Sequence, residues 1–155
     1  MLDEINLEIL NILQQDARTS NADIARQVGL TPSATLERIR KLETNGYIQN
    51  YEARLDGDAM GLGLIAFIFV NVDEPVASWE AGELFAEIPQ VLEVHHITGE
   101  DCYLLKVRVK DTNALGLLLK ERLGAIKSVR STRTVVALKT VKETFNLPLG
   151  EVHLE

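Results

Sequence analysis

Apolar residues in the first third of the chain recur every three to four positions, which is the spacing of one helix face. The pattern predicts a helix over residues 3–15. It predicts a second, shorter helix after Ser20, because Ser20 and Asp23 form a start like a capping box and Gly29 follows the last apolar position. These signals place two helices ahead of a tight turn.

A third helix is predicted directly after this turn. Thr31 is a suitable N-cap, Pro32 occupies the first helical position, and Asn45-Gly46 ends the helix. Residues 20–45 therefore read as the helix-turn-helix of a DNA-binding protein, although two helices of an ordinary bundle would share the pattern. The third helix is expected to leave one face free for bases and phosphates. The candidate DNA-binding residues are Thr31, Ser33, Thr35, Glu37, Arg38, Arg40 and Lys41.

Residues 47–55 mix apolar and polar side chains as a small hairpin does, with Asn50 as a turn residue. Three helices followed by a hairpin make a winged helix-turn-helix. Residues 1–55 are therefore predicted to be a winged helix-turn-helix domain. The next stretch, residues 56–63, has three glycines and two aspartates in eight positions and is predicted to be a linker.

After the linker, stretches in which apolar residues follow the spacing of a strand alternate with stretches in which they follow the spacing of a helix. A strand covered on two sides is expected first, and the second helix is expected to begin at the cap Asp111 or Thr112. The predicted order is strand 64–72, helix 78–88 capped by Ser78, strands 91–98 and 103–109, helix 112–123 and strand 129–141. This is the ferredoxin-like βαββαβ arrangement, so the fold class is α+β. Residues 64–142 form the second domain, and no structure is assigned to the tail, residues 143–155.

Both helices of this second domain must cover the same face of a four-stranded antiparallel sheet. The other face is expected to show apolar side chains from the first strand and from Val135, Val136 and Leu138. Such a surface is too apolar to remain in contact with water, so a second copy of the chain is expected to cover it. The sequence therefore predicts a homodimer, in the form of a dimeric α+β barrel.

Composition narrows the choice of function. The net charge of −7 argues against indiscriminate binding to nucleic acid. Affinity for DNA would then have to come from the local cluster Arg38, Arg40 and Lys41, repeated in several linked copies. A single cysteine, Cys102, excludes an internal disulfide framework. No apolar run is long enough for a membrane helix, and the N-terminus lacks the basic region of a signal peptide. The cytoplasm is therefore the expected location, without a membrane partner.

Three stretches together resemble the Lrp/AsnC family, also called feast/famine transcription regulators. They are LDEINLEILNILQQDAR, SNADIARQVGLTPSATLERIRKLETNGYI and TGEDCYLLKVRV, which are similar to the family's opening helix, its helix-turn-helix and its effector loop. The resemblance implies dimers that assemble into tetramers or octamers, bind double-stranded promoter DNA and respond to an amino acid or a related small metabolite.

The resemblance also implies where an effector binds. It places the site between dimers, at the loop between the two middle strands and at polar groups of the last strand. Backbone N–H groups in such a turn can hold a carboxylate. The implied residues are Gly99, Glu100, Asp101, Cys102, Tyr103, Ser131, Thr132 and Thr134. The loop departs from the family's usual pattern, which has an aromatic residue and an aspartate before the tyrosine where this chain has Asp101 and Cys102. An ordinary hairpin turn with acidic residues is the alternative interpretation.

Other chemistry is poorly supported by the residues. His95 and His96 lie near Cys102, but adjacent residues of a strand point to opposite faces and cannot share one metal or nucleophile site. Trp79 is interpreted as a surface anchor. We expect no catalytic residue, no metal and no cofactor. The alternative function is a small enzyme or a stand-alone metabolite-binding module on a dimeric α+β barrel, with the N-terminal helices as a docking appendage.

Overall fold

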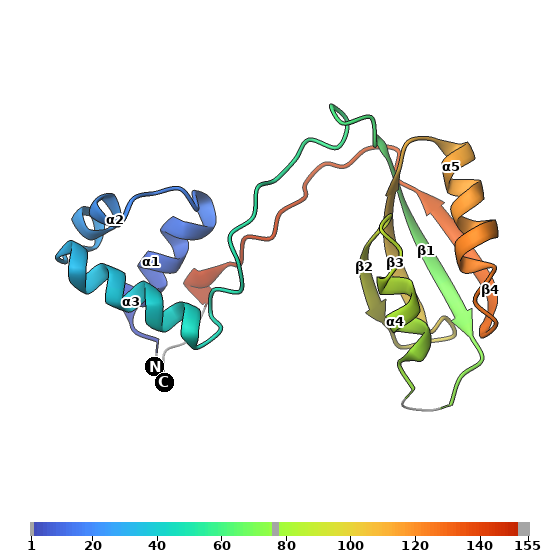
Figure 1. Ribbon diagram of the computed structural model, residues 1–155, viewed down its shortest axis with the longest axis horizontal. Coiled ribbons are helices and arrows are strands. Elements are labelled where there is room, and N and C mark those ends of the chain that lie inside the picture. Colours follow the sequence, from blue (N-terminus) through green and yellow to red (C-terminus); the bar gives the residue numbers. More distant parts are fainter. Residues whose placement is uncertain (1, 76–77, 152–155) are drawn as a thin grey trace. The chain divides into compact units, whose positions relative to one another are not determined.

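The computed structural model describes residues 2–75 and 78–151, and the chain divides into two compact units (Figure 1). The N-terminal unit comprises residues 1–54 together with 142–155, and the C-terminal unit comprises residues 55–141. The C-terminal tail therefore groups with the N-terminal helices, although it follows the last strand in the sequence. Residues 152–155 of the predicted tail lie outside the described part of the chain.

The three predicted N-terminal helices are all present. They are α1 (Glu4–Gln15), α2 (Asn21–Val28) and α3 (Pro32–Thr44). The side chain of Ser20 caps α2 by accepting a hydrogen bond from the Asp23 N–H, and the side chain of Thr31 caps α3. Gly29 ends α2 with φ of 70°, a left-handed conformation that glycine adopts without the steric cost of a Cβ. The helix-turn-helix is therefore confirmed down to its caps.

The predicted wing is wrong: residues 47–55 contain no strand. The N–H groups of Tyr47 and Ile48 instead donate back to the Leu42 carbonyl at 2.9 and 3.3 Å, which extends the end of α3. The Tyr51 hydroxyl donates to Glu43 at 2.8 Å. An isolated two-stranded hairpin is at best marginally stable in water, so contacts with the end of α3 determine the conformation of this segment.

The C-terminal unit contains the predicted antiparallel sheet. Its strands are β1 (Leu64–Val72), β2 (Val91–His96), β3 (Tyr103–Val109) and β4 (Val129–Val136), in the order β2-β3-β1-β4. This order confirms the split βαβ topology. The last strand was predicted to continue to residue 141, but β4 ends at Val136. Among the described residues, β4 is an edge strand that pairs only with β1, and β1 begins at Leu64, so residues after Ala137 have no partner strand there.

Two helical segments cover one face of this sheet, as predicted. They are α4 (Glu80–Ala86) and α5 (Thr112–Leu117), which continues as the π-helical turn Leu118–Leu123 (Figure 1). Asp111 caps α5 as expected, with its carboxylate accepting from the Ala114 N–H at 2.8 Å. Ser78 does not cap α4: Trp79 is the N-cap residue, and the Glu74 carboxylate accepts from the Ala81 N–H at 3.2 Å.

The two faces of the sheet differ in burial. Ala66, Ile68 and Val70 of β1 are fully buried against the helices, whereas Phe67 and Phe69 on the other side, here called the open face, are only half-buried. Val135 pairs with Phe67 and lies on the open face as predicted. Val136 was expected there too, but it pairs with Ala66 and so lies on the helix side.

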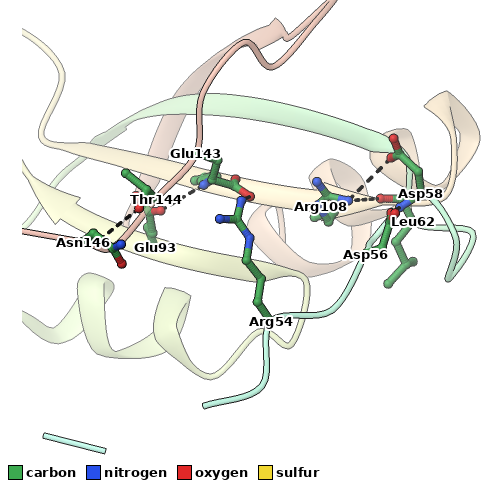
Figure 2. Close-up of polar contacts among 10 residues, drawn as sticks. Arg54, Asp56, Asp58, Leu62, Glu93, Arg108, Glu143, Thr144 and Asn146 are labelled. Carbon is green, nitrogen blue, oxygen red and sulfur yellow. Dashed lines mark hydrogen bonds and ion pairs between the residues drawn. The ribbon is translucent and has the colours of Figure 1, made fainter. Parts of the chain in front are cut away.

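The segment predicted as a linker is folded against the C-terminal unit (Figure 2). The Asp56 carboxylate accepts from the N–H groups of Asp58 and Ala59, which makes a tight turn. Arg108 of β3 donates to the Leu62 carbonyl at 3.0 Å and lies 3.7 Å from the Asp58 carboxylate. The composition of this stretch correctly indicated turns. The segment is not a free connection, however, because Arg108 holds it against the sheet.

Candidate DNA-binding and ligand-binding sites

The exposed part of α3 is smaller than its sequence predicts. Thr35 was expected on the free face, but it is fully buried, and its hydroxyl has no hydrogen-bond partner among the described residues. A side chain in this position cannot reach DNA, so the assignment of Thr35 to the DNA-binding surface is wrong. Its position in the sequence held a signal, because Thr35 precedes the buried Ile39 and Leu42 by four and seven residues and so shares their helix face.

Arg38 also differs from its expected position. Its guanidinium donates to the Asp3 carboxylate at 2.7 Å and to the Asn6 side-chain oxygen at 2.9 Å, and 30% of the side chain is exposed. Both partners belong to the start of α1. The prediction that Arg38 lies on a free face is therefore wrong, because Arg38 joins α3 to α1.

The remaining candidates on α3 are exposed. Lys41 forms an ion pair with Glu37 one helical turn earlier at 2.7 Å, and this ammonium lowers the pKa of the Glu37 carboxyl. Arg40 is exposed, as are Thr31 and Ser33 at the start of the helix. The hydroxyl of Thr31 is occupied as the N-cap, accepting from the Ala34 N–H at 3.2 Å. The free face thus presents hydroxyls at its N-terminal end and cations further along.

The loop between β2 and β3 is held in place by backbone contacts. The Ile97 N–H donates to the Cys102 carbonyl at 2.9 Å, and the Cys102 N–H donates to the Val70 carbonyl at 3.0 Å. The side chain of Asn71 donates to the Glu100 carbonyl at 2.7 Å. Gly99 has φ of 112°, which side chains rarely tolerate. The loop therefore has a defined conformation at the end of β1.

A charged pair lies beside this loop. Arg133 of β4 donates to the Asp101 carboxylate at 3.2 Å, and its guanidinium lies over the Phe69 ring at 3.9 Å from the centroid. Because Arg133 pairs with Phe69 in the sheet, this cluster lies on the open face. Sequence reasoning missed Phe69, Asn71 and Arg133. Only the register of β1 with β4 brings them to the loop, although the alternation within each strand could have shown that they share a face.

The structure divides the predicted effector residues between two faces. Gly99, Glu100, Asp101 and Cys102 lie in the loop, and Ser131 lies on the open face opposite Asn71. The side chains of three other residues lie on the helix side instead: Tyr103, Thr132 and Thr134. Within one chain these three side chains therefore do not lie on the face that carries Asp101 and Arg133, because neighbouring residues of a strand point to opposite sides of the sheet.

Tyr103 belongs to the core of the C-terminal unit. Only 1% of its surface is exposed, and its hydroxyl donates to the Glu74 carboxylate at 2.7 Å. Its ring makes edge contacts with Phe85 and with His96, and the His96 ring in turn contacts Trp79. Burial and the hydrogen bond to Glu74 raise the pKa of Tyr103 to about 12.

The histidine pair is separated as the strand pattern predicts. His96 pairs with Tyr103 on the helix side, whereas His95 pairs with Leu104 on the open face and contacts Glu93 at 3.0 Å. In the described part of the chain, no group of three or more potential metal-binding side chains is close enough to hold an ion. Over the same residues, every helix is too short or too polar to cross a membrane.

Comparison with known proteins gives matches to both units. The family described as Lrp/AsnC ligand binding domain matches residues 65–147, and the AsnC-type helix-turn-helix domain matches residues 2–43. The HTH-type transcriptional regulator FL11 of Pyrococcus horikoshii is 38% identical over 148 residues, which cover 96% of this chain and 97% of that protein.

Solved structures agree with these matches. A transcriptional regulator of Neisseria meningitidis in complex with L-methionine has a TM-score of 0.90 and 33% identity, over 96% of this chain and 97% of that one. The feast or famine regulatory protein of M. tuberculosis, complexed with L-methionine, has a TM-score of 0.87 and 31% identity, over 95% of this chain and 99% of that one. The chain belongs to the Lrp/AsnC family of DNA-binding transcription regulators.

Proposed function

We propose that this regulator senses a free amino acid at the loop between β2 and β3, on the open face of the sheet. The observation that carries the proposal is the pair Asp101 and Arg133 beside the Phe69 ring. An amino acid has a carboxylate, an ammonium group and a side chain. Arg133 offers donors for the carboxylate, Asp101 accepts from the ammonium, and Phe69 offers apolar contact.

Two similar structures support an amino acid as the ligand class, since both hold L-methionine. The loop also supplies Gly99, where a ligand can approach the backbone closely, and Ser131 contributes a hydroxyl on the same face. In this proposal, the effector displaces the mutual contact of Asp101 and Arg133 and bonds to both. Tyr103, Thr132 and Thr134 are not part of the site.

Calorimetric titration of the full-length chain with each free amino acid, beginning with L-methionine, tests the proposal. We expect binding to the wild type and its loss in Asp101→Asn and in Arg133→Met. The control is Arg130→Met. Arg130 lies on β4 like Arg133, but it pairs with Asp73, so its loss should leave binding intact. The site is wrong if no amino acid binds the wild type, or if binding survives both changes.

We also propose that the protein acts as a dimer or a larger assembly formed through the open face. Val135 is 47% exposed, and Phe67 beside it is half-buried, which leaves apolar surface for a second copy. Two copies would place two recognition helices at a fixed spacing on DNA, so the preferred site should be roughly two-fold symmetric. Sedimentation at micromolar concentration should give at least a dimer, and Val135→Asp should shift the mass downward; a monomeric wild type would contradict this.

The DNA contacts are proposed to come from Ser33, Arg40 and Lys41, with Glu37 competing for Lys41. The matched relative FL11 is a transcription regulator, so we propose a regulatory role and no catalytic one. Such a protein would act in the compartment that holds the DNA, which in a bacterium or archaeon is the cytoplasm. Selection of a duplex from a randomised pool by the wild-type protein, followed by anisotropy titration, tests DNA binding directly.

A further inference from the structure

Arg38 lies on the recognition helix but contacts the start of α1. Its Nη1 atom donates both to Asp3 Oδ2 and to Asn6 Oδ1. The second carboxylate oxygen of Asp3 accepts from the Asn6 N–H at 2.7 Å and so caps α1. The Asp3 carboxylate therefore accepts one hydrogen bond from the first turn of α1 and one from the Arg38 guanidinium of α3 at the same time.

The surroundings favour a permanent contact over a transient one. Asn6 is only 8% exposed, although its side chain is polar, and a polar group in that position needs its hydrogen bonds. Near this contact, α1 and α3 pack through Ile9, Ile39 and Leu42, which form part of a small apolar core. A core of five buried side chains supplies few apolar contacts, so a directional contact at one end contributes to fixing the relative position of the helices.

We infer that Arg38 is a positioning residue: through Asp3 and Asn6 it sets the orientation of α3 against α1, and it does not bind a DNA phosphate. The inference rests on the proposed DNA-binding role of α3. It divides the three cations of the sequence cluster into two kinds. Arg40 and Lys41 meet the DNA, whereas Arg38 determines how the helix that carries them is presented.

Salt dependence separates the two roles. A side chain that binds a phosphate releases counterions from the DNA. Its removal therefore makes the negative slope of log K for DNA binding against log salt shallower, by about one for each DNA-binding unit engaged. A positioning residue weakens binding without this change. The probe is a duplex selected from a randomised pool by the wild-type protein, and affinities are measured by fluorescence anisotropy at several salt concentrations.

The variants are Arg38→Gln, Asp3→Asn and Arg40→Gln, each in the full chain. Asparagine is a good N-cap, so Asp3→Asn keeps the cap of α1 while it removes the charge that holds Arg38. We expect Arg38→Gln and Asp3→Asn each to reduce affinity about tenfold, the equilibrium effect of one charged hydrogen bond, with the wild-type slope. Arg40→Gln should make the slope shallower.

The double variant Asp3→Asn/Arg38→Gln should bind no worse than Arg38→Gln alone, because both changes break the same contact. In Asp3→Asn/Arg40→Gln, the losses of DNA-binding free energy caused by the two single changes should add. The inference is overturned if Arg38→Gln makes the slope shallower as Arg40→Gln does, or if Asp3→Asn strengthens binding by releasing Arg38 to the DNA. If the wild type selects no duplex, the proposed function fails, and thermal unfolding of the same Asp3 and Arg38 variants still measures whether their contact joins α1 to α3.

Discussion

The two units of this regulator differ in the size of their internal apolar cores. Counted over the described residues, fourteen buried side chains form the core of the C-terminal unit, and they come from β1, β3, the two helical segments and Ile88. Five buried side chains form the core of the N-terminal unit. The smaller core is supplemented by polar contacts such as Asp3 with Arg38 and Tyr51 with Glu43. The unit that binds DNA thus has the smaller apolar core, and the unit with the candidate sensing site has the larger one.

The N-terminal unit also recruits the far end of the chain. The Gln14 side chain of α1 donates to the Leu147 carbonyl at 3.0 Å and accepts from the Leu147 N–H at 2.9 Å. Arg54 forms an ion pair with Glu143 at 3.1 Å (Figure 2). Residues 142–148 follow β4 by a short connection, so the C-terminal unit is joined covalently to the N-terminal unit at two points. The tail, which has no pattern of its own, thereby has a structural role.

Deleting core methyl groups tests the comparison most strongly. Ile9 in the N-terminal unit and Ile68 in the C-terminal unit are both fully buried, and Ile9→Ala or Ile68→Ala should each cost about 2–5 kcal/mol. We expect Ile9→Ala to unfold its small unit and abolish DNA binding, and Ile68→Ala to lower the melting temperature of a unit that remains folded. Calorimetry and anisotropy measure the two effects, and equal tolerance in both units would contradict the comparison.

Alkaline pH should destabilise the C-terminal unit more than the N-terminal one. Tyr103 has a folded pKa of about 12 against an ordinary value of 10.0, so the unfolded chain loses its phenolic proton first. Stability present at neutral pH is therefore lost as the pH rises above about 10, by on the order of 2 kcal/mol. Denaturant unfolding should show this slope in the wild type and not in Tyr103→Phe.

Tyr51 is the matched control in the N-terminal unit. Burial and a hydrogen bond to Glu43 also raise the pKa of Tyr51 to about 12, but 48% of this residue is exposed. Solvent screening should leave only a small pH dependence, so Tyr51→Phe should preserve most of the alkaline slope. If Tyr51→Phe removed more of the alkaline dependence of stability than Tyr103→Phe, the comparison between the units would be reversed.

Thr35→Val should stabilise the N-terminal unit by about 1 kcal/mol, because it replaces a buried hydroxyl without a partner among the described residues by a methyl group. DNA affinity should not change. Ser33→Ala, at an exposed position of the same helix, should show the opposite result, with lower affinity and unchanged stability. Thermal unfolding and anisotropy of both variants provide the measurement, and weaker DNA binding by Thr35→Val would return Thr35 to the interface.

The smallest expected effect concerns the tail. Gln14→Ala should lower the stability of the N-terminal unit by less than about 1 kcal/mol, since the two hydrogen bonds to Leu147 are exposed to water. Gln15→Ala, at the neighbouring exposed position, is the control and should have no effect on the docking of the tail. Protection of the Leu147 amide from hydrogen exchange should fall in the first variant alone; unchanged protection would show that the tail docks by other contacts.

The sequence by itself determined the elements and their order. Capping residues, such as Ser20 and Thr31, act within one turn, and the alternation within Tyr103–Val109 is a property of one strand, so both can be read locally. Those signals predicted three helices, a βαββαβ order and the helix-covered face of the sheet. They also predicted the loop at Gly99, where the conformation requires glycine.

Tertiary structure decided which side chains are available for function. Arg38 and Arg40 look equivalent in the sequence, and only the packing of α1 on α3 gives Arg38 its partners 32 and 35 residues away. Likewise, only the register of β1 with β4 brings Arg133 to Asp101 and Phe69, and only the length of β1 ends β4 at Val136. Contacts between distant segments depend on how whole elements pack, and no local pattern in the chain encodes that geometry.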